Sequence, residues 1–336
     1  MLDVSRTNDA DATILSQLID AWPNYVSGSS IAQKLGITRV SVWGRLEKLK
    51  ESGFTFEAVR NRGYRLTQRP ERLHISLVRA LLQLRKRPLD LLYLPVVDST
   101  NDEAERQLAQ GCPTPLVVLA RKQEKGRGRL GRPWHSADSD NLYLSFAFRP
   151  RMEPSKLQRF TPWMGIRLAE LLREHCAAPV LVKWPNDLFC QGRKLGGMLT
   201  EARVDADGTR DLVFGLGLNV NSDPAAFPEA LADVATSLKS VTGQAQEIND
   251  LAVAVIETVV EGYNEVLDGR AQRQIADRWQ RLDMLNDRPV KVERAEREHL
   301  QGVARGIDPS GALLVEFNGG GVRPVLAGDV VLQRTD

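Results

Sequence analysis

The sequence predicts an α+β protein of several domains: an N-terminal winged helix-turn-helix, a central mixed α/β sheet and a small C-terminal β-barrel. Three observations predict it. The chain begins with helical apolar periodicity, its middle mixes strands and helices without steady βαβ alternation, and it ends in short strands with glycine turns. At 336 residues two or three domains are expected, and we place them at 1–68, 72–285 and 286–336.

Composition and charge exclude several classes of protein. Hydrophobic residues make up 42% and charged residues 26%, as in an ordinary globular protein, and a net charge of +2 does not favour polyanion binding by the whole molecule. Cys112, Cys176 and Cys190 have no Cys-x-x-Cys spacing, which argues against a disulfide framework or a zinc site. Without a signal-peptide pattern or a long apolar run, we expect a cytoplasmic protein with no membrane partner.

The N-terminal residues have the pattern of a helix-turn-helix followed by a wing. Helices are expected over 12–25 and 29–35, and after a glycine turn Thr38 caps a third helix that runs to about Ser52. Its inward residues are Val42, Leu46 and Leu49. Residues 54–66 alternate like a hairpin, with 61–63 at or near the turn.

Charge indicates that this module binds nucleic acid. Between Trp22 and Pro70 nine basic residues stand against three acidic ones, the electrostatic footprint of DNA binding. The third helix would enter the major groove, and the wing would meet phosphate or the minor groove. The residues expected at the DNA are Arg39, Ser41, Val42 and Arg45 on the helix and Arg60 and Arg62 on the wing. The alternative is a winged domain used for protein contacts.

The rest of the chain divides into a mixed part and an all-β part. Strands are expected over 91–97, 116–120, 141–148, 180–184, 194–204 and 212–220, and helices over 74–84, 102–110, 156–176 and most of 233–281. From 288 to 334 short strands follow, with glycine turns at Gly302, Gly306, Gly311 and 319–321.

A loop of glycines and arginines, from Glu124 to Trp134, is the first candidate binding element. Glycine lets a ligand approach the backbone, and arginine supplies a charged fork that fits phosphate or carboxylate. The spacing Gly126-x-Gly128-x-x-Gly131 also matches the dinucleotide fingerprint, but neither a strand directly before it nor a helix after it is expected. The alternative is a solvated basic loop.

A second candidate is the stretch from Lys183 to Asp187, which follows an apolar strand. The turn formers Pro185 and Asn186 place the lysine and the carboxylate at the strand end. Lys183 can neutralise a phosphate or carboxylate, and Asp187 can hold Mg²⁺ or orient the lysine. The alternative is a surface ion pair.

Together the two stretches resemble the biotin–protein ligase family. The pattern Gly-Arg-Gly-Arg-x-Gly-Arg and then Lys-Trp-Pro-Asn-Asp stands unbroken at 126–132 and 183–187, and further similar segments keep the family order. They lie at 98–101, 196–201, 215–221, 288–290 and 306–314. The N-terminal part is similar to the subset of the family that represses biotin synthesis genes. The resemblance implies a class II synthetase-like central domain and an SH3-like C-terminal domain.

The resemblance also implies the chemistry and the site. ATP and biotin would form biotinyl-5′-AMP, with Mg²⁺, and biotin would pass to a lysine of biotin carboxyl carrier protein, an acetyl-CoA carboxylase subunit. Lys183 and Arg129 would be catalytic. The biotin pocket would hold Ser99, Thr100, Asn101, Gln123, Arg127, Gly128, Arg129 and Lys183. The nucleotide would meet Arg132, Trp134, Asn186 and Asn219, and Asp187 is the metal candidate.

Several alternatives stay open at this point. Ser99, Thr100 and Asn101 stand at a strand-to-helix corner, where such residues cap helices. The protein could be a ligase whose winged domain binds no operator DNA, a ligand-responsive transcription factor with an inactive ligase fold, or a lipoate-type ligase. The bifunctional hypothesis includes operator DNA as a partner and a homodimer in the adenylate-bound state.

Overall fold

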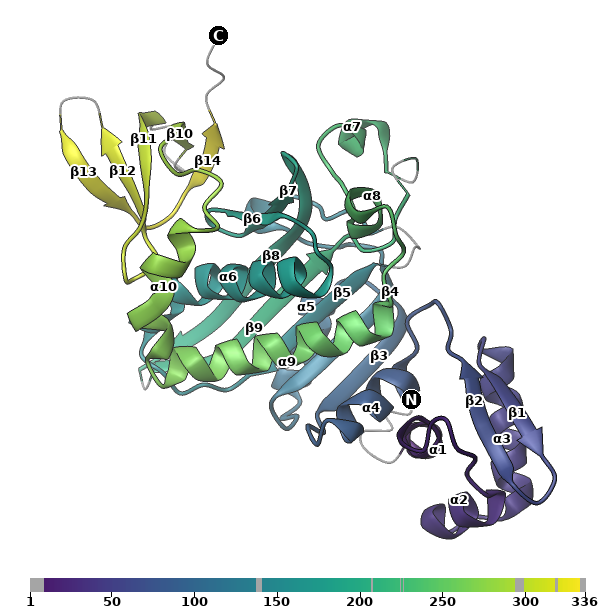
Figure 1. Cartoon of the computed structure of the whole chain (residues 1–336). Coiled ribbons are helices and arrows are strands. Elements are labelled where there is room, and N and C mark those ends of the chain that lie inside the picture. The colour runs from purple at the N-terminus through teal and green to yellow at the C-terminus, as the bar shows by residue number, and fades with distance from the viewer. Residues whose placement is uncertain are drawn as a thin grey trace. The chain divides into compact units, whose positions relative to one another are not determined.

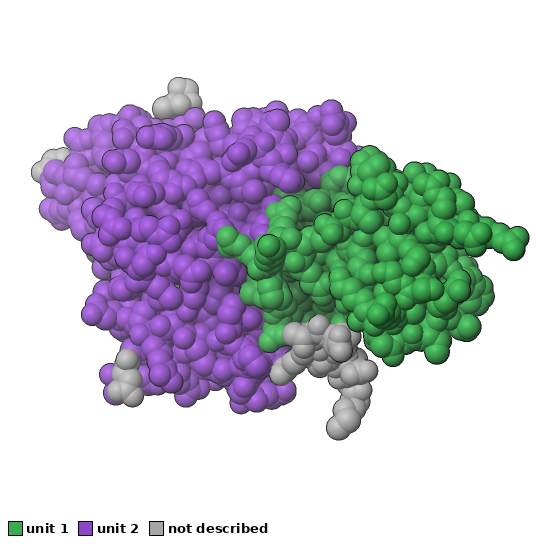
Figure 2. All heavy atoms as spheres, turned by 60° about the horizontal axis from the view of Figure 1, so that its bottom comes forward, with its two compact units in different colours: residues 1–93, 247–253 green, residues 94–246, 254–336 purple. Residues whose placement is uncertain are grey.

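The computed structural model of the chain describes residues 9–136, 141–206, 208–223, 225, 227–293, 299–317 and 320–332. It contains two compact units, residues 1–93 with 247–253 and residues 94–246 with 254–336, which Figure 2 colours separately. The glycine turn expected at Gly319 and the strand end expected at Arg334 lie outside the described residues.

Three helices begin the first unit: α1 (Ala10–Asp20), α2 (Gly28–Leu35) and α3 (Arg39–Glu51). The hydroxyl of Thr38 accepts a hydrogen bond from the Ser41 N–H, so the predicted cap of α3 is confirmed. Helix α1 ends before the expected Tyr25, because Pro23 disfavours helical geometry in the residue before it.

The wing is the hairpin of β1 (Thr55–Val59) and β2 (Gly63–Gln68), as predicted. Its last pair is Val59 with Gly63, at φ 111°, where a Cβ would lie 2.1 Å from the Val26 carbonyl oxygen. Only glycine fits this left-handed position. Helix α4 (Ile75–Leu84) then packs on α1.

A seven-stranded sheet forms the middle of the chain, in the order β3-β4-β5-β9-β8-β7-β6 (Figure 1). Its strands are β3 (Asp90–Val97), β4 (Leu116–Gln123), β5 (Leu142–Phe148), β6 (Val180–Lys183), β7 (Asp187–Cys190), β8 (Arg193–Asp205) and β9 (Gly208–Leu218). Helix α5 (Thr100–Ala109) joins β3 to its neighbour β4, and the pairs from β4 to β6 are antiparallel. The predicted mixed sheet is confirmed.

Helices cover both faces of this sheet. Thr200 of β8 contacts Thr161 of α6 (Leu157–His175), and the next residue, Glu201, contacts Asn101 of α5. Since successive strand residues point to opposite faces, α5 and α6 lie on opposite sides. Helix α9 (Ile248–Leu267) runs beside α6 in Figure 1, where Trp163 donates to Glu265. Strand β5 is therefore buried along its whole length, not on alternate residues.

The remaining elements follow the prediction with one addition. Helices α7 (Glu229–Ala232), α8 (Leu238–Thr242) and α10 (Arg270–Gln280) fill the helical part, and the unpredicted β7 completes a hairpin with β6. Five antiparallel strands end the chain: β10 (Pro289–Glu293), β11 (His299–Ile307), β12 (Leu313–Phe317), β13 (Gly321–Val325) and β14 (Asp329–Leu332). Within the described residues, no helix combines the length and apolarity that crossing a membrane requires.

Candidate active site and nucleic-acid interface

The second unit contains a cavity of about 290 Å³ above the central sheet. Its walls come from the start of α5, the glycine–arginine loop, the β6–β7 hairpin, strands β8 and β9, and β14 of the C-terminal sheet. Segments far apart in the sequence therefore meet at one place. The predicted residues that line it are Ser99, Thr100, Asn101, Gln123, Arg127, Gly128, Arg129, Arg132, Trp134, Lys183, Asn186 and Asp187.

Asn219 does not line this cavity. Its side chain is buried, and its amide donates to the Thr236 carbonyl at 3.0 Å. The structure therefore does not bring this predicted nucleotide residue to the other ones.

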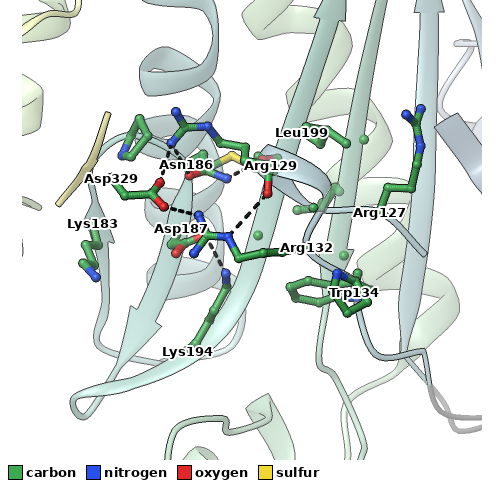
Figure 3. Close-up of a pocket in the computed structure, with 18 of the residues that line it drawn as sticks. Arg127, Arg129, Arg132, Trp134, Lys183, Asn186, Asp187, Lys194, Leu199 and Asp329 are labelled. Carbon is green, nitrogen blue, oxygen red and sulfur yellow. Dashed lines mark hydrogen bonds and ion pairs between the residues drawn. The ribbon is translucent and has the colours of Figure 1, made fainter. Parts of the chain in front are cut away.

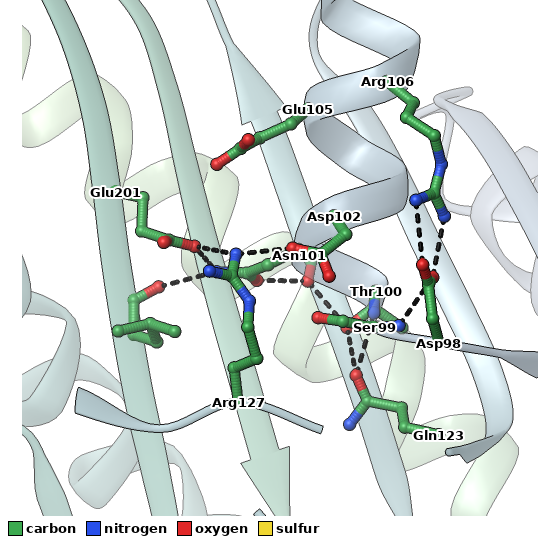
Figure 4. A network of polar contacts seen from close by, with 12 residues as sticks. Asp98, Ser99, Thr100, Asn101, Asp102, Glu105, Arg106, Gln123, Arg127 and Glu201 are labelled. Atoms are coloured by element: carbon green, nitrogen blue, oxygen red, sulfur yellow. Dashed lines mark hydrogen bonds and ion pairs between the residues drawn. The ribbon is translucent and has the colours of Figure 1, made fainter. Parts of the chain in front are cut away.

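One end of the cavity is a network of neutral polar groups (Figure 4). The backbone N–H and the hydroxyl of Thr100 both donate to Gln123 Oε1, at 2.8 and 3.0 Å. Ser145 Oγ lies 2.8 Å from Thr100 Oγ1 and 2.6 Å from Asn101 Oδ1. Ser99 occupies the N-cap position of α5, but its side chain makes no capping bond. Capping therefore does not account for these residue types.

Asn101 connects this network to the sheet. Its amide donates to Glu201 Oε2 at 2.8 Å, and a Cβ on Gly215 would lie 2.2 Å from Asn101 Oδ1. A larger residue at 215 would displace the amide, so glycine in β9 makes the room that Asn101 occupies.

Arg127 holds the start of the glycine–arginine loop to this end. Its guanidinium lies 2.7 Å from Asp102 Oδ1 and 2.8 Å from Glu201 Oε2 (Figure 4). Burial raises the pKa of Asp102, although the Arg127 charge opposes that rise. Ion pairs of Arg127 therefore anchor the start of the loop beside the network of neutral polar groups.

The backbone of the loop closes on itself. The Gly128 N–H donates to the Arg132 carbonyl at 2.7 Å, and the Trp134 N–H donates to the Gly126 carbonyl at 2.8 Å. A Cβ on Gly126 would come 2.7 Å from the Trp134 carbonyl oxygen, which explains the first glycine. The loop is therefore a closed turn whose arginines line the cavity, not a dinucleotide-binding helix start.

Trp134 lies flat over glycines of the sheet. A Cβ on Gly217 would lie 2.4 Å from its ring, and one on Gly197 would lie 3.0 Å from it. Lys194 Nζ stands 5.5 Å from the centre of the same ring. The indole N–H is buried and has no hydrogen-bond partner in the part of the chain that the structure describes. The site thus offers a ligand the Trp134 ring to stack on and the indole N–H as a hydrogen-bond donor.

The other end of the cavity is charged and begins with the β6–β7 hairpin. Lys183 and Asp187 face each other in register, and Trp184 fixes the turn by donating from Nε1 to the Gly311 carbonyl at 3.1 Å. Asp187 is ion-paired with Lys194 at 2.7 Å, so the expected Lys183–Asp187 surface pair is not the arrangement seen. Burial lowers the pKa of Lys183, and the Asp187 charge only partly offsets this.

Asp329 of β14 completes the charged end (Figure 3). Its carboxylate is ion-paired with Arg132 and lies 3.4 Å from Arg129, whose guanidinium also contacts Asn186 and the Gly328 carbonyl. Burial lowers the pKa of Arg129 from its ordinary value. A carboxylate of the C-terminal sheet therefore sits on the two arginines expected to meet anionic ligands.

Sequence analysis missed several residues of this site. Lys194, Glu293, Asp329, Val330 and Val331 line the cavity, whereas Ser145 and Glu201 hold lining residues in place through hydrogen bonds and an ion pair. Glu201 belongs to a segment already similar to the family, which was a usable signal. Asp329 stands in an ordinary short strand, and nothing in its neighbourhood marks it.

The metal candidate Asp187 stands without a ligand cluster. Across the described ranges, no group of three His, Cys, Asp or Glu residues is placed to hold a metal ion. The carboxylate is also engaged by Lys194. By itself Asp187 does not fit a protein-bound Mg²⁺ site, because Mg²⁺ usually needs phosphates or further oxygen ligands.

The residues expected to contact DNA form two groups, one on helix α3 and one on the wing. On α3, Arg39 and Ser41 are exposed, whereas Val42 is fully buried in the core. The expectation that Val42 approaches base edges is wrong, since it lies on the same face as Leu46 and Leu49. Arg45 is tied to Asp11 of α1 at 2.8 Å.

The wing residues remain at the surface. Arg60 and Arg62 are exposed at the hairpin turn. The Arg62 guanidinium lies over the Tyr25 ring, 4.2 Å from its centre, which orients it.

Family models match three parts of the chain. Residues 12–65 match an HTH domain, 93–219 the biotin/lipoate A/B protein ligase family, and 287–333 the biotin protein ligase C-terminal domain. The three matches follow the order of the winged module, the central sheet and the C-terminal sheet.

Curated relatives cover nearly the whole chain. The bifunctional ligase/repressor BirA of Bacillus subtilis is 30% identical over 96% of this chain and 99% of its own length. That of Escherichia coli is 31% identical over 97% of this chain and 99% of its own length. Among solved structures, the biotin protein ligase from Aquifex aeolicus in complex with biotin and ATP has a TM-score of 0.63 and 28% identity, covering 73% of this chain and 99% of that one. The chain therefore belongs to the biotin protein ligases, and within them to the bifunctional ligase/repressors.

Proposed function

We propose that this protein is an ATP-dependent biotin ligase that also acts as a biotin-responsive repressor of biotin synthesis genes. It converts biotin and ATP to biotinyl-5′-AMP and pyrophosphate, then transfers biotin to a lysine of biotin carboxyl carrier protein. The observation that carries the ligase proposal is that two motifs, at 126–132 and 183–187, line one cavity. The full-length relatives named bifunctional ligase/repressor support both activities.

The first step joins two anions, which dictates what the site must supply. A biotin carboxylate oxygen bonds to the α-phosphorus of ATP, and the bond from that phosphorus to the bridging oxygen breaks, releasing pyrophosphate. No side chain has to act as nucleophile, so catalysis rests on positioning and charge stabilisation. We assign this role to Lys183, at the end of β6, and to Arg129, which contacts Asn186 of the β6–β7 turn.

The neutral end of the cavity suits the uncharged head group of biotin. Hydroxyl and amide groups can both donate to and accept from a cyclic urea, which has N–H groups beside a carbonyl. We assign this role to Ser99, Thr100, Asn101 and Gln123. Hydrogen bonds to Ser145 and to one another already hold Thr100, Asn101 and Gln123 in place. Arg127 and Gly128 would close over the bound ligand.

The charged end suits the nucleotide. We propose that Trp134 stacks on adenine and that Arg132 and Asn186 bind the phosphates. The phosphates would then replace the Asp329 carboxylate as the partner of Arg132. Mg²⁺ would enter with the triphosphate, and Asp187 would be one of its ligands once Lys194 turns to the phosphates. The adjacent positions of these groups around one cavity support the assignment.

The second step needs access for an acceptor lysine. Its amine attacks the carbonyl carbon of the mixed anhydride, an amide bond forms, and AMP leaves with the bonding electron pair. A lysine side chain must therefore reach the reacting carbonyl, beside the positions proposed for Arg129 and Lys183, which both line the cavity.

A biotin-dependent ATP–pyrophosphate exchange assay tests the ligase proposal, with lipoate as the control acid. Exchange with biotin alone supports it, and exchange with lipoate alone would assign the protein to the lipoate ligases. A protein that exchanges but binds no operator DNA would be a ligase only.

For repression we propose that biotinyl-5′-AMP drives homodimerisation through the central domain and that the dimer binds a palindromic operator. Ordering the ligand loops lowers the entropy cost of association, and couplings of about 1–3 kcal/mol are typical of linked sites. Sedimentation with and without adenylate tests this, and an unchanged monomer–dimer equilibrium contradicts it.

We further propose the domain limits 1–68, 72–285 and 286–336, which limited proteolysis of the intact chain can map. We place the protein in the cytoplasm, as its cysteine pattern favours.

A further inference from the structure

Helix α3 presents two different faces. Val42, Leu46 and Leu49 are buried in the module. Away from this buried face Val40 is 75% exposed and Trp43 is 55% exposed, about one helical turn apart. Exposed apolar residues are common singly, but a valine beside a tryptophan forms a continuous apolar strip on the helix that the fold offers to DNA.

Two of the polar residues first expected to contact bases, Arg45 and Ser41, have partners within the winged module. Arg45 is ion-paired with Asp11, and the Ser41 hydroxyl lies 2.9 Å from that of Thr38. The outward face thus offers apolar groups where hydrogen-bonding groups were predicted.

Gly44 follows this strip and lacks an intramolecular explanation. It sits inside the helix without a positive φ, and a Cβ built on it meets no atom within 4 Å. Neither backbone geometry nor packing requires glycine here, and glycine inside a helix destabilises it relative to alanine. A partner that approaches the helix backbone closely would explain the residue.

The surroundings of the strip identify the class of partner. The exposed residues Arg39, Lys48 and Lys50 lie on the same helix, and Arg60 and Arg62 lie on the wing. Glu47 lies one turn after Trp43 and is ion-paired with Lys50, so the cations outnumber the carboxylate beside the strip. An apolar strip with mainly cations around it fits a polyanion that displays apolar groups between its charges. The major groove of DNA is such a surface, because the thymine 5-methyl group projects into it between the phosphates.

We propose that Val40 and Trp43 contact thymine methyl groups of the operator and that Gly44 lets the α3 backbone lie against the base edges. This rests on the repressor function proposed above and names its specificity determinants. Arg39 and the wing arginines then supply phosphate contacts, which fix position without selecting sequence.

The first test needs an operator sequence. The intact protein, with biotin and ATP, selects bound duplexes from a random pool, and each thymidine of the selected site is then replaced by deoxyuridine. Deoxyuridine pairs as thymidine does and lacks only the methyl group. Replacement at one or two positions of each half-site should weaken binding roughly three- to fivefold per methyl group, the effect of losing the burial of one methyl-sized apolar group. Equal binding at every substituted position would overturn the proposal.

Trp43→Ala tests the side chain. It should weaken binding to the thymidine operator, while its affinity for the deoxyuridine operator should equal that of the wild type. Trp22→Ala is the matched control, since Trp22 is 67% exposed in the turn after α1 and lies off the α3 face. A Trp43→Ala protein that still discriminates thymidine from deoxyuridine as strongly as wild type would contradict the assignment.

Gly44→Ala separates close approach from folding. Alanine favours the helix, so the variant should unfold no earlier than wild type on heating, yet it should bind the operator several-fold more weakly. Undiminished binding would remove Gly44 from the interface. If the wild-type protein selects no sequence at all, the repressor function fails first, and this outcome is distinct from selection of a site that is indifferent to thymine methyls.

Discussion

The two ends of the ligand cavity are built in different ways. The end around Thr100, Gln123 and Ser145 is neutral and comes from the central sheet and its first helix, with short hydrogen bonds already in place. The end around Arg129, Arg132 and Asp329 is charged, and the C-terminal sheet supplies its carboxylate. On the assignment proposed above, the first end is already arranged for its ligand, whereas at the second end Asp329 neutralises the arginines that the nucleotide would meet.

Because of this difference, the free-energy cost of rearranging the site on binding should differ between the two substrates. A neutral hydrogen-bonded pocket changes little when a neutral ring enters, so removing one hydroxyl leaves its partners unsatisfied. Ion pairs with solvent access contribute little stability, so a triphosphate can displace a carboxylate at small cost. Changes at the neutral end should therefore affect biotin, and changes at the charged end should affect ATP and chemistry.

The largest effect is expected from Lys183→Ala. Loss of a preorganised charge at the reacting phosphate should reduce biotin-dependent pyrophosphate exchange by at least about 10²-fold. Lys50→Ala is the matched truncation, because Lys50 pairs with Glu47 on the surface of the winged module. A folded Lys183→Ala protein with near-normal exchange would refute the assigned role.

Thr100→Val tests the neutral end. The substitution keeps the shape but leaves Gln123 and Ser145 without the hydroxyl they share, so the KM for biotin should rise about tenfold while the KM for ATP stays near its wild-type value. The control is Thr161→Val, which removes a similar hydroxyl contact, to Thr200, on the other face of the sheet. Equal changes in both KM values would show that the two ends are not separate.

Asp329→Asn tests the charged end and should act in the opposite direction. Without the carboxylate, Arg129 and Arg132 are released to the phosphates, and the KM for ATP should fall about two- to fivefold, as expected for partly exposed ion pairs. Biotin affinity should not change. Glu316→Gln, in an exposed pair with Arg305, is the control in the same sheet. A raised KM for ATP would mean that Asp329 organises the arginines instead of competing for them.

The pH dependence gives the smallest and most specific test. Burial lowers the pKa of Lys183, so its charge is lost at a lower pH than that of an ordinary lysine. Because the charged form is required, exchange should decline as pH rises through that lowered pKa. Arginine keeps its charge throughout, so Lys183→Arg should lose this alkaline decline even if its rate is lower. An identical alkaline decline in both proteins would assign the titration to another group.

The sequence alone determined the domain order, most of the elements and the two motifs at the cavity. Periodicity placed α3 and its Thr38 cap, because caps and helix faces depend on residues within one or two turns. The resemblance named the residues of the glycine–arginine loop and of the hairpin from Lys183 to Asp187. It could do so because these residues are contiguous in the chain, and a short sequence motif consists of contiguous residues.

Only the tertiary structure decided which distant residues complete those patterns. Ser145 of the central sheet holds Thr100 and Asn101 in place, and Asp329 of the C-terminal sheet lines the cavity. Neither residue has a local sequence pattern that marks it. The same holds for α3, because the sequence has valine at both position 40 and position 42. Packing against the module buries Val42, and Val40 is exposed because two residues span roughly half a helical turn, which places the two valines on different faces. Local residue types fix what a segment can become, but which side chain meets a ligand depends on contacts between segments that the chain brings together only by folding.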